Sequence, residues 1–199
     1  NGNVAIYSTV GRAAEKLTIN NAENVTISIR DAAGAVSGDT KITASGTVIL
    51  KNNAPGGHVG TVTFKQADGK KYVYYTSEAE DAKLIDPRIH PLAEAAGSSY
   101  LRIEPREAYS ITVANGTAQV VGDTDGKLPT AFAGEKVTVS GNNKNPSVTK
   151  FGGWKVISPE GFELTEEQKN TEENMTFTMP ASSVELKASY SFPAPVVDM

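Results

Sequence analysis

Aliphatic residues recur at a nearly constant spacing in the first half of this chain, and the spacing narrows the possible folds more than any other feature. Three positions recur after 23 residues and two after 21. The residues concerned are Val4, Ile6, Ile19, Val25, Ile27, Ile42, Val48 and Leu50. A period of this length is typical of one coil of a solenoid rather than of a series of hairpins. Because side chains alternate along a strand, each coil would bury one aliphatic row against the next.

This pattern predicts that residues 1–107 form the end of a short parallel β-helix closed by a hairpin. Val62 and Phe64 continue the alternation, and the turn-like segment 67–70 separates them from Tyr72 and Tyr74. We therefore expect residues 62–66 and 72–75 to pair as a capping hairpin. Segment 78–96 contains two prolines and is expected to be an irregular connection. A β-sandwich remains an alternative for this first part.

A second all-β unit is predicted for residues 108–192, because the pattern of apolar runs and turn residues changes after Pro105. Asn115-Gly116 is a strong turn signal between two alternating runs, which predicts a hairpin. Further strands are expected at 136–140, 153–157, 175–179 and 184–190. Thr165 is suited to cap a single helical turn over 165–169. Residues 193–199 contain two prolines and are interpreted as the start of a linker.

The second unit resembles the divergent internalin-type B-repeat, or bacterial repeat domain, of Gram-positive surface proteins. Three segments carry this resemblance: 109–118, Phe151-Gly152-Gly153-Trp154, and 175–181 ahead of 184–190. The resemblance covers residues 109–192 and implies a small β-sheet domain of β-grasp or sandwich-like form. The first part is loosely similar to the right-handed parallel β-helices of secreted proteins of gut bacteria. Together the two resemblances imply display outside the cell.

Composition excludes several classes of partner and chemistry. The formal net charge of −4 offers no basic surface for nucleic acid or for an anionic membrane. The absence of cysteine excludes disulfides, thiolate nucleophiles and cysteine-ligated zinc. No stretch is long and apolar enough to insert into a membrane. Since the chain begins with Asn1 and not with methionine, we interpret it as a fragment from which any signal peptide was removed or never included.

The titratable residues do not predict catalysis or a metal site. Neither His58 nor His90 has an acidic residue or a second histidine at a spacing typical of ligands, so both are expected to be loop histidines. The segment 122–126 resembles the start of a calcium loop, but its twelfth position is Gly134 rather than glutamate. Arg30, Asp31 and Asp39 are the only charged residues in the first coils that a polysaccharide-degrading enzyme could use.

We expect a non-catalytic extracellular segment of a bacterial cell-surface protein, with a structural or adhesive display role and no cofactor. Its partners would be glycans or proteins of the host or cell surface. The alternative is a carbohydrate-binding module in which Tyr72 and Tyr74 form an exposed platform for sugar rings. A fragment of a polysaccharide-degrading enzyme is the third interpretation. Trp154, the only tryptophan, is expected to lie in the core of the second unit.

Overall fold

The protein is all-β and divides into two compact units, Asn1–Glu107 and Ala108–Met199. The computed structural model describes residues 2–8, 17–30, 40–66, 71–123 and 130–192. Each unit has its own sheets and its own buried residues, and each sheet among the described residues belongs to one unit alone. The predicted linker at 193–199 and the turn at 67–70 lie outside the described residues.

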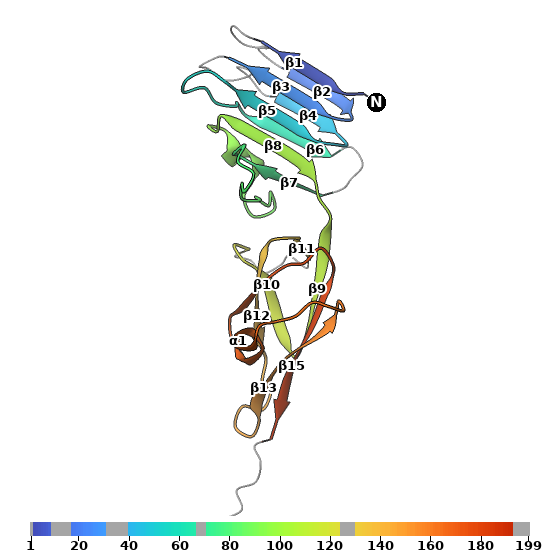
Figure 1. Ribbon diagram of the computed structural model, residues 1–199, viewed down its shortest axis with the longest axis vertical. Coiled ribbons are helices and arrows are strands. Elements are labelled where there is room, and N and C mark those ends of the chain that lie inside the picture. The colour runs from blue at the N-terminus through green and yellow to red at the C-terminus, as the bar shows by residue number, and fades with distance from the viewer. Residues whose placement is uncertain (1, 9–16, 31–39, 67–70, 124–129, 193–199) are drawn as a thin grey trace, which may run out of the picture. The chain divides into compact units, whose positions relative to one another are not determined.

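The first unit contains two sheets (Figure 1). The five-stranded sheet has the order β1-β3-β5-β8-β7, and the three-stranded sheet has the order β2-β4-β6. The strands of the first sheet are β1 (Val4–Tyr7), β3 (Val25–Ile29), β5 (Val48–Asn52), β8 (Tyr100–Pro105) and β7 (Tyr72–Tyr75). Those of the second are β2 (Leu17–Ala22), β4 (Thr40–Ala44) and β6 (Val62–Gln66).

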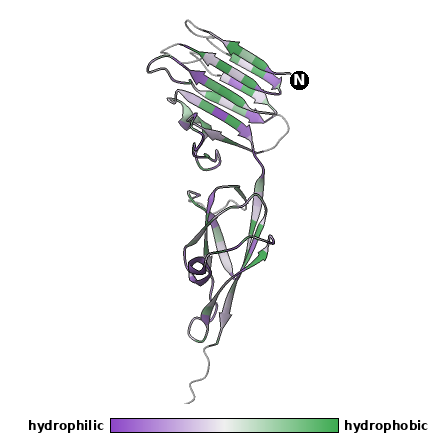
Figure 2. Cartoon of the chain, in the orientation of Figure 1, coloured by the Kyte–Doolittle hydropathy of each residue, from purple (hydrophilic) through white to green (hydrophobic). Residues whose placement is uncertain are grey.

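The spacing of the aliphatic residues sets the register of both sheets. Strands β1, β3 and β5 run parallel, and Val4, Val25 and Val48 share one row across them. Strands β2 and β4 are also parallel, with Ile19 opposite Ile42 as the spacing predicts. Of the residues in these rows, Ile19, Val25, Ile42 and Val48 are buried and Val4 is half-buried. Hydrophobic positions alternate along the strands in Figure 2. Stacking of equivalent aliphatic residues is therefore the main source of hydrophobic stabilisation in this unit.

The tight corner between β2 and β3 is held by side-chain amides. Asn24 accepts a hydrogen bond from the backbone amide of Thr47 on its Oδ1 at 2.8 Å and donates from its Nδ2 to Asn3 at 3.0 Å. An added Cβ at Gly46 would overlap Asn24 Oδ1, so the backbone approaches this side chain too closely for any larger residue. Each corner is thus bonded to the corner before and after it.

The expected capping hairpin between 62–66 and 72–75 does not form. Strand β6 pairs in parallel with β4, whereas β7 pairs antiparallel with β8 in the other sheet. Strand β8 in turn runs antiparallel to β5, with Ile103 opposite Val48. The chain between β7 and β8 contains the short 3-10 helix Leu92–Ala95, whose Leu92 and Ala95 join the core. The parallel stacking is therefore closed by an antiparallel pair whose two strands are distant in sequence.

The second unit also contains two sheets, of three and four strands. The three-stranded sheet has the order β10-β12-β14, and its strands are β10 (Gly116–Val120), β12 (Lys136–Gly141) and β14 (Met175–Thr178). The four-stranded sheet has the order β11-β9-β15-β13, and its strands are β11 (Thr130–Phe132), β9 (Ala108–Ala114), β15 (Val184–Ser191) and β13 (Lys150–Ser158). The short helix α1 (Glu166–Asn170) has the capping box predicted from Thr165, completed by Gln168.

The hairpin predicted around Asn115-Gly116 does not form. Strands β9 and β10 are separated by Asn115 alone and belong to different sheets, β10 pairing with β12. Asn115 has a φ of 58°, the left-handed conformation that asparagine tolerates better than most residues. This residue therefore directs the chain from one sheet to the other instead of closing a two-stranded ladder.

Candidate functional site

The two tyrosines predicted to form a sugar platform do not lie on an exposed face. Tyr74 is 1% exposed, and its Oη donates to the carbonyl oxygen of His90 at 3.1 Å. Tyr72 is half-buried with its ring edge-on to Phe64, the centroids 4.8 Å apart. Burial raises the pKa of both phenols. The expected exposed row is absent because Tyr74 belongs to the hydrophobic core of the first unit and Tyr72 packs against that core.

Sequence reasoning missed a charged cluster around Tyr75. The Arg102 guanidinium lies 4.2 Å from the centre of the Tyr75 ring, and the Tyr75 Oη donates to Glu104 at 3.1 Å. Arg106 donates to the Tyr75 Oη at 2.9 Å and to Glu104 at 2.8 Å. Burial and the Glu104 carboxylate raise the pKa of Tyr75. The i, i+2 spacing of Arg102 and Glu104 in β8 and of Arg106 just after it was the available signal, and the cluster ties this segment to β7.

One histidine has an acidic neighbour that sequence reasoning missed. His90 Nδ1 lies 3.2 Å from Glu94 Oε2, and both side chains are 57% exposed. The two residues are four apart at the start of the short 3-10 helix, a spacing that brings side chains together on a helical turn. His58 is half-buried, and its carbonyl oxygen accepts from the Asn52 side chain at 3.0 Å. Among the described residues, no three His, Cys, Asp or Glu side chains are grouped to hold a metal ion. Asp31, Asp39 and residues 124–126 lie outside the described residues.

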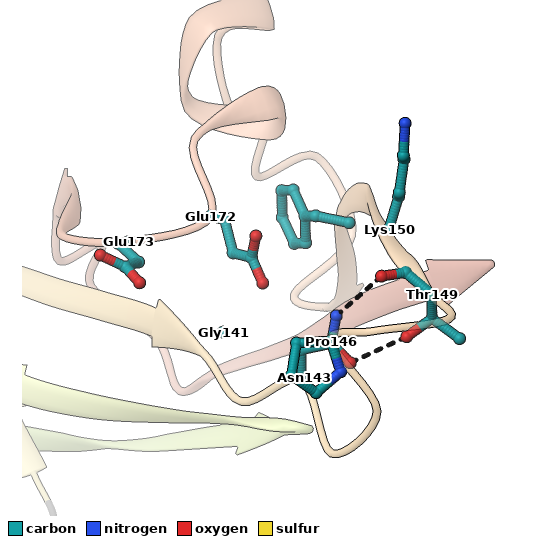
Figure 3. Close-up of a pocket in the computed structure, with 8 residues that line it drawn as sticks. Gly141, Asn143, Pro146, Thr149, Lys150, Glu172 and Glu173 are labelled. Atoms are coloured by element: carbon teal, nitrogen blue, oxygen red, sulfur yellow. Dashed lines mark hydrogen bonds between the residues drawn. The ribbon is translucent and has the colours of Figure 1, made fainter. Parts of the chain in front are cut away.

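The described part of the second unit contains a groove of about 510 Å³ (Figure 3). It is lined by Gly141, Asn143, Pro146, Thr149, Lys150, Phe151, Glu172 and Glu173. We call this feature the 141–173 groove. In Figure 3 the loop that contains Asn143 and Thr149 lies to one side of it, and the two glutamates lie to the other.

The loop that forms the first wall is ordered by its own side chains. Asn143 donates to the carbonyl oxygen of Thr149 at 3.1 Å and accepts from the Thr149 hydroxyl at 2.8 Å (Figure 3). The Asn143 side chain also accepts from the Asn145 backbone amide at 3.0 Å. These bonds occupy the amide of Asn143, so this wall offers shape rather than free hydrogen-bonding groups.

The second wall is fixed to the core. Trp154 is 4% exposed, and its Nε1 donates to the carbonyl oxygen of Thr171 at 2.7 Å. The backbone amide of Gly141 donates to the carbonyl oxygen of Glu172 at 2.8 Å. The segment that carries Glu172 and Glu173 is therefore held from two directions, and its carboxylates are presented at defined positions.

The floor of the groove is aromatic. The Phe151 ring packs edge-on to Trp154 and Tyr190, with centroid distances of 5.8 and 5.7 Å. Burial, together with the adjacent Glu172 carboxylate, raises the pKa of Tyr190 to about 12. The Tyr190 oxygen is itself buried and forms no hydrogen bond of normal geometry. The phenol is therefore neutral at physiological pH, and the groove carries the charges of two carboxylates and of Lys150 at its rim.

The groove contains groups that can contact a polar ligand. An aromatic ring beside carboxylates can contact a sugar, because the ring packs on the apolar face and the carboxylates accept from hydroxyls. No protein-family model matches the chain, and comparison with curated proteins and with solved structures finds no significant similarity. No helix in the described part of the chain has the length and apolarity needed to cross a bilayer.

Proposed function

We propose that this chain is a non-catalytic, extracellular segment of a bacterial cell-surface protein that displays or spaces other parts of that protein. The observation that carries the proposal is the in-register stacking of equivalent residues in β1, β3 and β5. A unit built from repeated coils extends in one direction by a constant step, about 4.8 Å for each added strand. Such a scaffold suits spacing and display better than enclosure of a substrate.

The same proposal assigns each unit to a type of module. Residues 1–107 are the end of a right-handed parallel β-helix, which the parallel pairing of β1 to β3 to β5 and of β2 to β4 to β6 supports. Residues 108–192 are a B-repeat-like domain, which the buried positions of Trp154 and Phe177 in the motif segments support. In this assignment the motif residues serve the core and not a ligand.

Labelling of intact cells tests the display role. Fab fragments raised against residues 1–199 should stain unpermeabilised cells of the producing bacterium, and treatment of those cells with a protease should remove the staining. An antibody against a cytoplasmic protein serves as the control for cell integrity. Staining that requires permeabilisation would refute the extracellular assignment.

Glycan contact is a second candidate function, favoured by the aromatic floor and the two carboxylates of the 141–173 groove. Glu172→Gln and Glu173→Gln should weaken binding of the full chain on a glycan array, because an amide is a poorer acceptor than a carboxylate. Glu160→Gln is the matched control, since Glu160 is exposed and does not line the groove. If the groove variants bind every glycan as the parent does, this groove is not the sugar site.

A further inference from the structure

The first and last strands of the second unit are adjacent and parallel. We propose that this unit is a mechanical clamp, which resists force transmitted along the chain while the first unit extends. The inference rests on the proposed display role, because a segment that links a cell surface to something outside it is loaded through its two ends.

The direction of pulling relative to β9 and β15 places their ladder in shear. Val184 lies opposite Ile111, and Lys187 lies opposite Ala114, with both strands running the same way. Force therefore enters at the beginning of β9 and leaves at the end of β15, at opposite ends of one ladder. The hydrogen bonds between parallel strands are evenly spaced, so they share this load and must break together.

Two side chains extend the ladder beyond its paired residues. The Ser183 hydroxyl accepts a hydrogen bond from the backbone amide of Ser110 at 3.2 Å, just before the first pair. The Asn115 side chain donates to the carbonyl oxygen of Ala188 at 3.1 Å, just after the last pair. Both ends of the ladder are thus closed by an additional bond between the segments that force would slide past each other.

Strand β15 is also held on its other edge and by its core face. It pairs antiparallel with β13 from Lys150 opposite Ser191 to Ser158 opposite Glu185. Its Leu186 and Ala188 side chains are fully buried. Sliding β15 would therefore break two ladders and expose apolar surface in one step, which raises the barrier to forced unfolding.

The first unit has the opposite geometry. Val4, Val25, Val48 and Ile103 form one row across β1, β3, β5 and β8. The chain enters β1 and leaves β8 at this same end of the sheet, because β8 runs antiparallel to the other three strands. Force across these two points is directed along the hydrogen bonds, so it breaks the bonds one after another from one end. The first unit should therefore unfold at lower force, coil by coil.

Pulling single molecules of the full chain through its two ends tests this contrast. Unfolding of the first unit should come first, at lower force and in several steps. The last event should be a single step that lengthens the tether by roughly 250 Å, because residues 108–191 extend by ~3.4 Å each while their two ends already lie ~35 Å apart along the folded ladder. Release of that length before the first unit unfolds would overturn the proposal.

Pulling the second unit in two directions distinguishes resistance that depends on the direction of force from thermodynamic stability, which is the same in both cases. The chain has no cysteine, so pairs of introduced cysteines define the attachment points. The pair A108C and S191C loads the β9–β15 ladder in shear, whereas K150C and S191C pull apart two residues that face each other at one end of the β13–β15 ladder. The first pair should require a force several times higher than the second. Equal forces, or a weaker first pair, would refute the clamp.

Removing one end bond gives a residue-level test with a matched control. Asn115→Gly keeps a residue that tolerates the φ of 58° and removes the bond to Ala188, so unfolding at constant force should accelerate about fivefold in the shear direction. Asn174→Gly also replaces an asparagine with positive φ, 56°, but lies outside both ladders and should leave that rate unchanged. Equal effects of the two variants would contradict the role of Asn115. These measurements are independent of surface labelling, so failure of the clamp and failure of the display role are distinguishable.

Discussion

Replacing Gly141 by alanine tests how tightly β12 packs against Tyr190 beside the groove. A Cβ at position 141 would overlap the Tyr190 Oη and lie 3.1 Å from the Glu172 Cγ. The Tyr190 ring is restrained because it packs against Phe151. Overpacking of this kind costs about 1–3 kcal/mol. Alanine also restricts the unfolded chain, which offsets about 0.4–1 kcal/mol of that cost. We expect a net destabilisation of about 1–2 kcal/mol.

A second substitution identifies the atom responsible. Tyr190→Phe removes the Oη, which forms no hydrogen bond of normal geometry, so this change alone should alter stability little. In that background the alanine at 141 meets only the Glu172 Cγ and the ring carbon that carried the hydroxyl. The cost of Gly141→Ala should therefore fall by about 1–2 kcal/mol, which is the coupling energy of the double-mutant cycle.

Urea unfolding followed by tryptophan fluorescence measures the cycle. Trp154 is the only tryptophan and is 4% exposed, so its emission reports on the second unit alone. The midpoints give the stability changes if the slopes with denaturant stay equal among the four proteins. If the stability changes of the two single variants sum to that of the double variant within ~0.5 kcal/mol, overlap with the Tyr190 Oη is not the cause of the destabilisation by Gly141→Ala.

Three further predictions concern the core, the coils and the ionisation of Tyr190. Trp154→Ala should destabilise the second unit by about 3–5 kcal/mol and leave the Thr171 carbonyl unpaired. In calorimetry the thermal unfolding transition of the second unit should be lost or shifted to lower temperature, while that of the first unit stays in place. Equal melting temperatures of parent and variant would contradict this prediction. Deletion of residues 25–47 removes one whole period, so the remaining strands should still pair in parallel and give the circular dichroism of a folded sheet. Deletion of residues 25–36 removes only part of a period and should unfold the first unit. Equal circular dichroism of the two variants would refute the coil interpretation. Because the pKa of Tyr190 is raised to about 12 from 10.0, the unfolded chain loses this proton first. The contribution of Tyr190 is therefore complete below pH 10 and is lost as the pH rises to about 12. The urea midpoint of the parent should accordingly fall more steeply over this range than that of Tyr190→Phe, and parallel curves would contradict the assignment.

The parallel registers were predictable from the sequence, because each depends on a residue type that repeats at fixed spacing. Val25 opposite Val48 and Ile19 opposite Ile42 follow directly from the period. The strands of the second unit other than β11, and the Thr165 cap, were predictable for a similar reason, since alternation and capping are local signals.

The pairing partners of the other strands were not predictable, because they depend on contacts that are distant in sequence. A turn signal indicates that the chain reverses but not that the flanking strands share a ladder, and so both expected hairpins were wrong. Tyr74 alternates as a half-exposed strand would, yet its side chain lies in the core together with Leu92 and Ala95 of the later 3-10 helix. The groove was missed because Gly141, Phe151 and Glu172 come from three separate segments, and only the fold brings these segments together.

The antiparallel placement of β8 on β5 has a consequence for how this chain can change over evolutionary time. Parallel coils require a partner whose direction matches, and β8 ends that series on one side. Duplication or loss of a 23-residue stretch between β1 and β5 would leave everything from β7 onward in its present surroundings. The number of coils can therefore drift between lineages by whole periods, while the terminating strands remain a fixed boundary that selection must preserve.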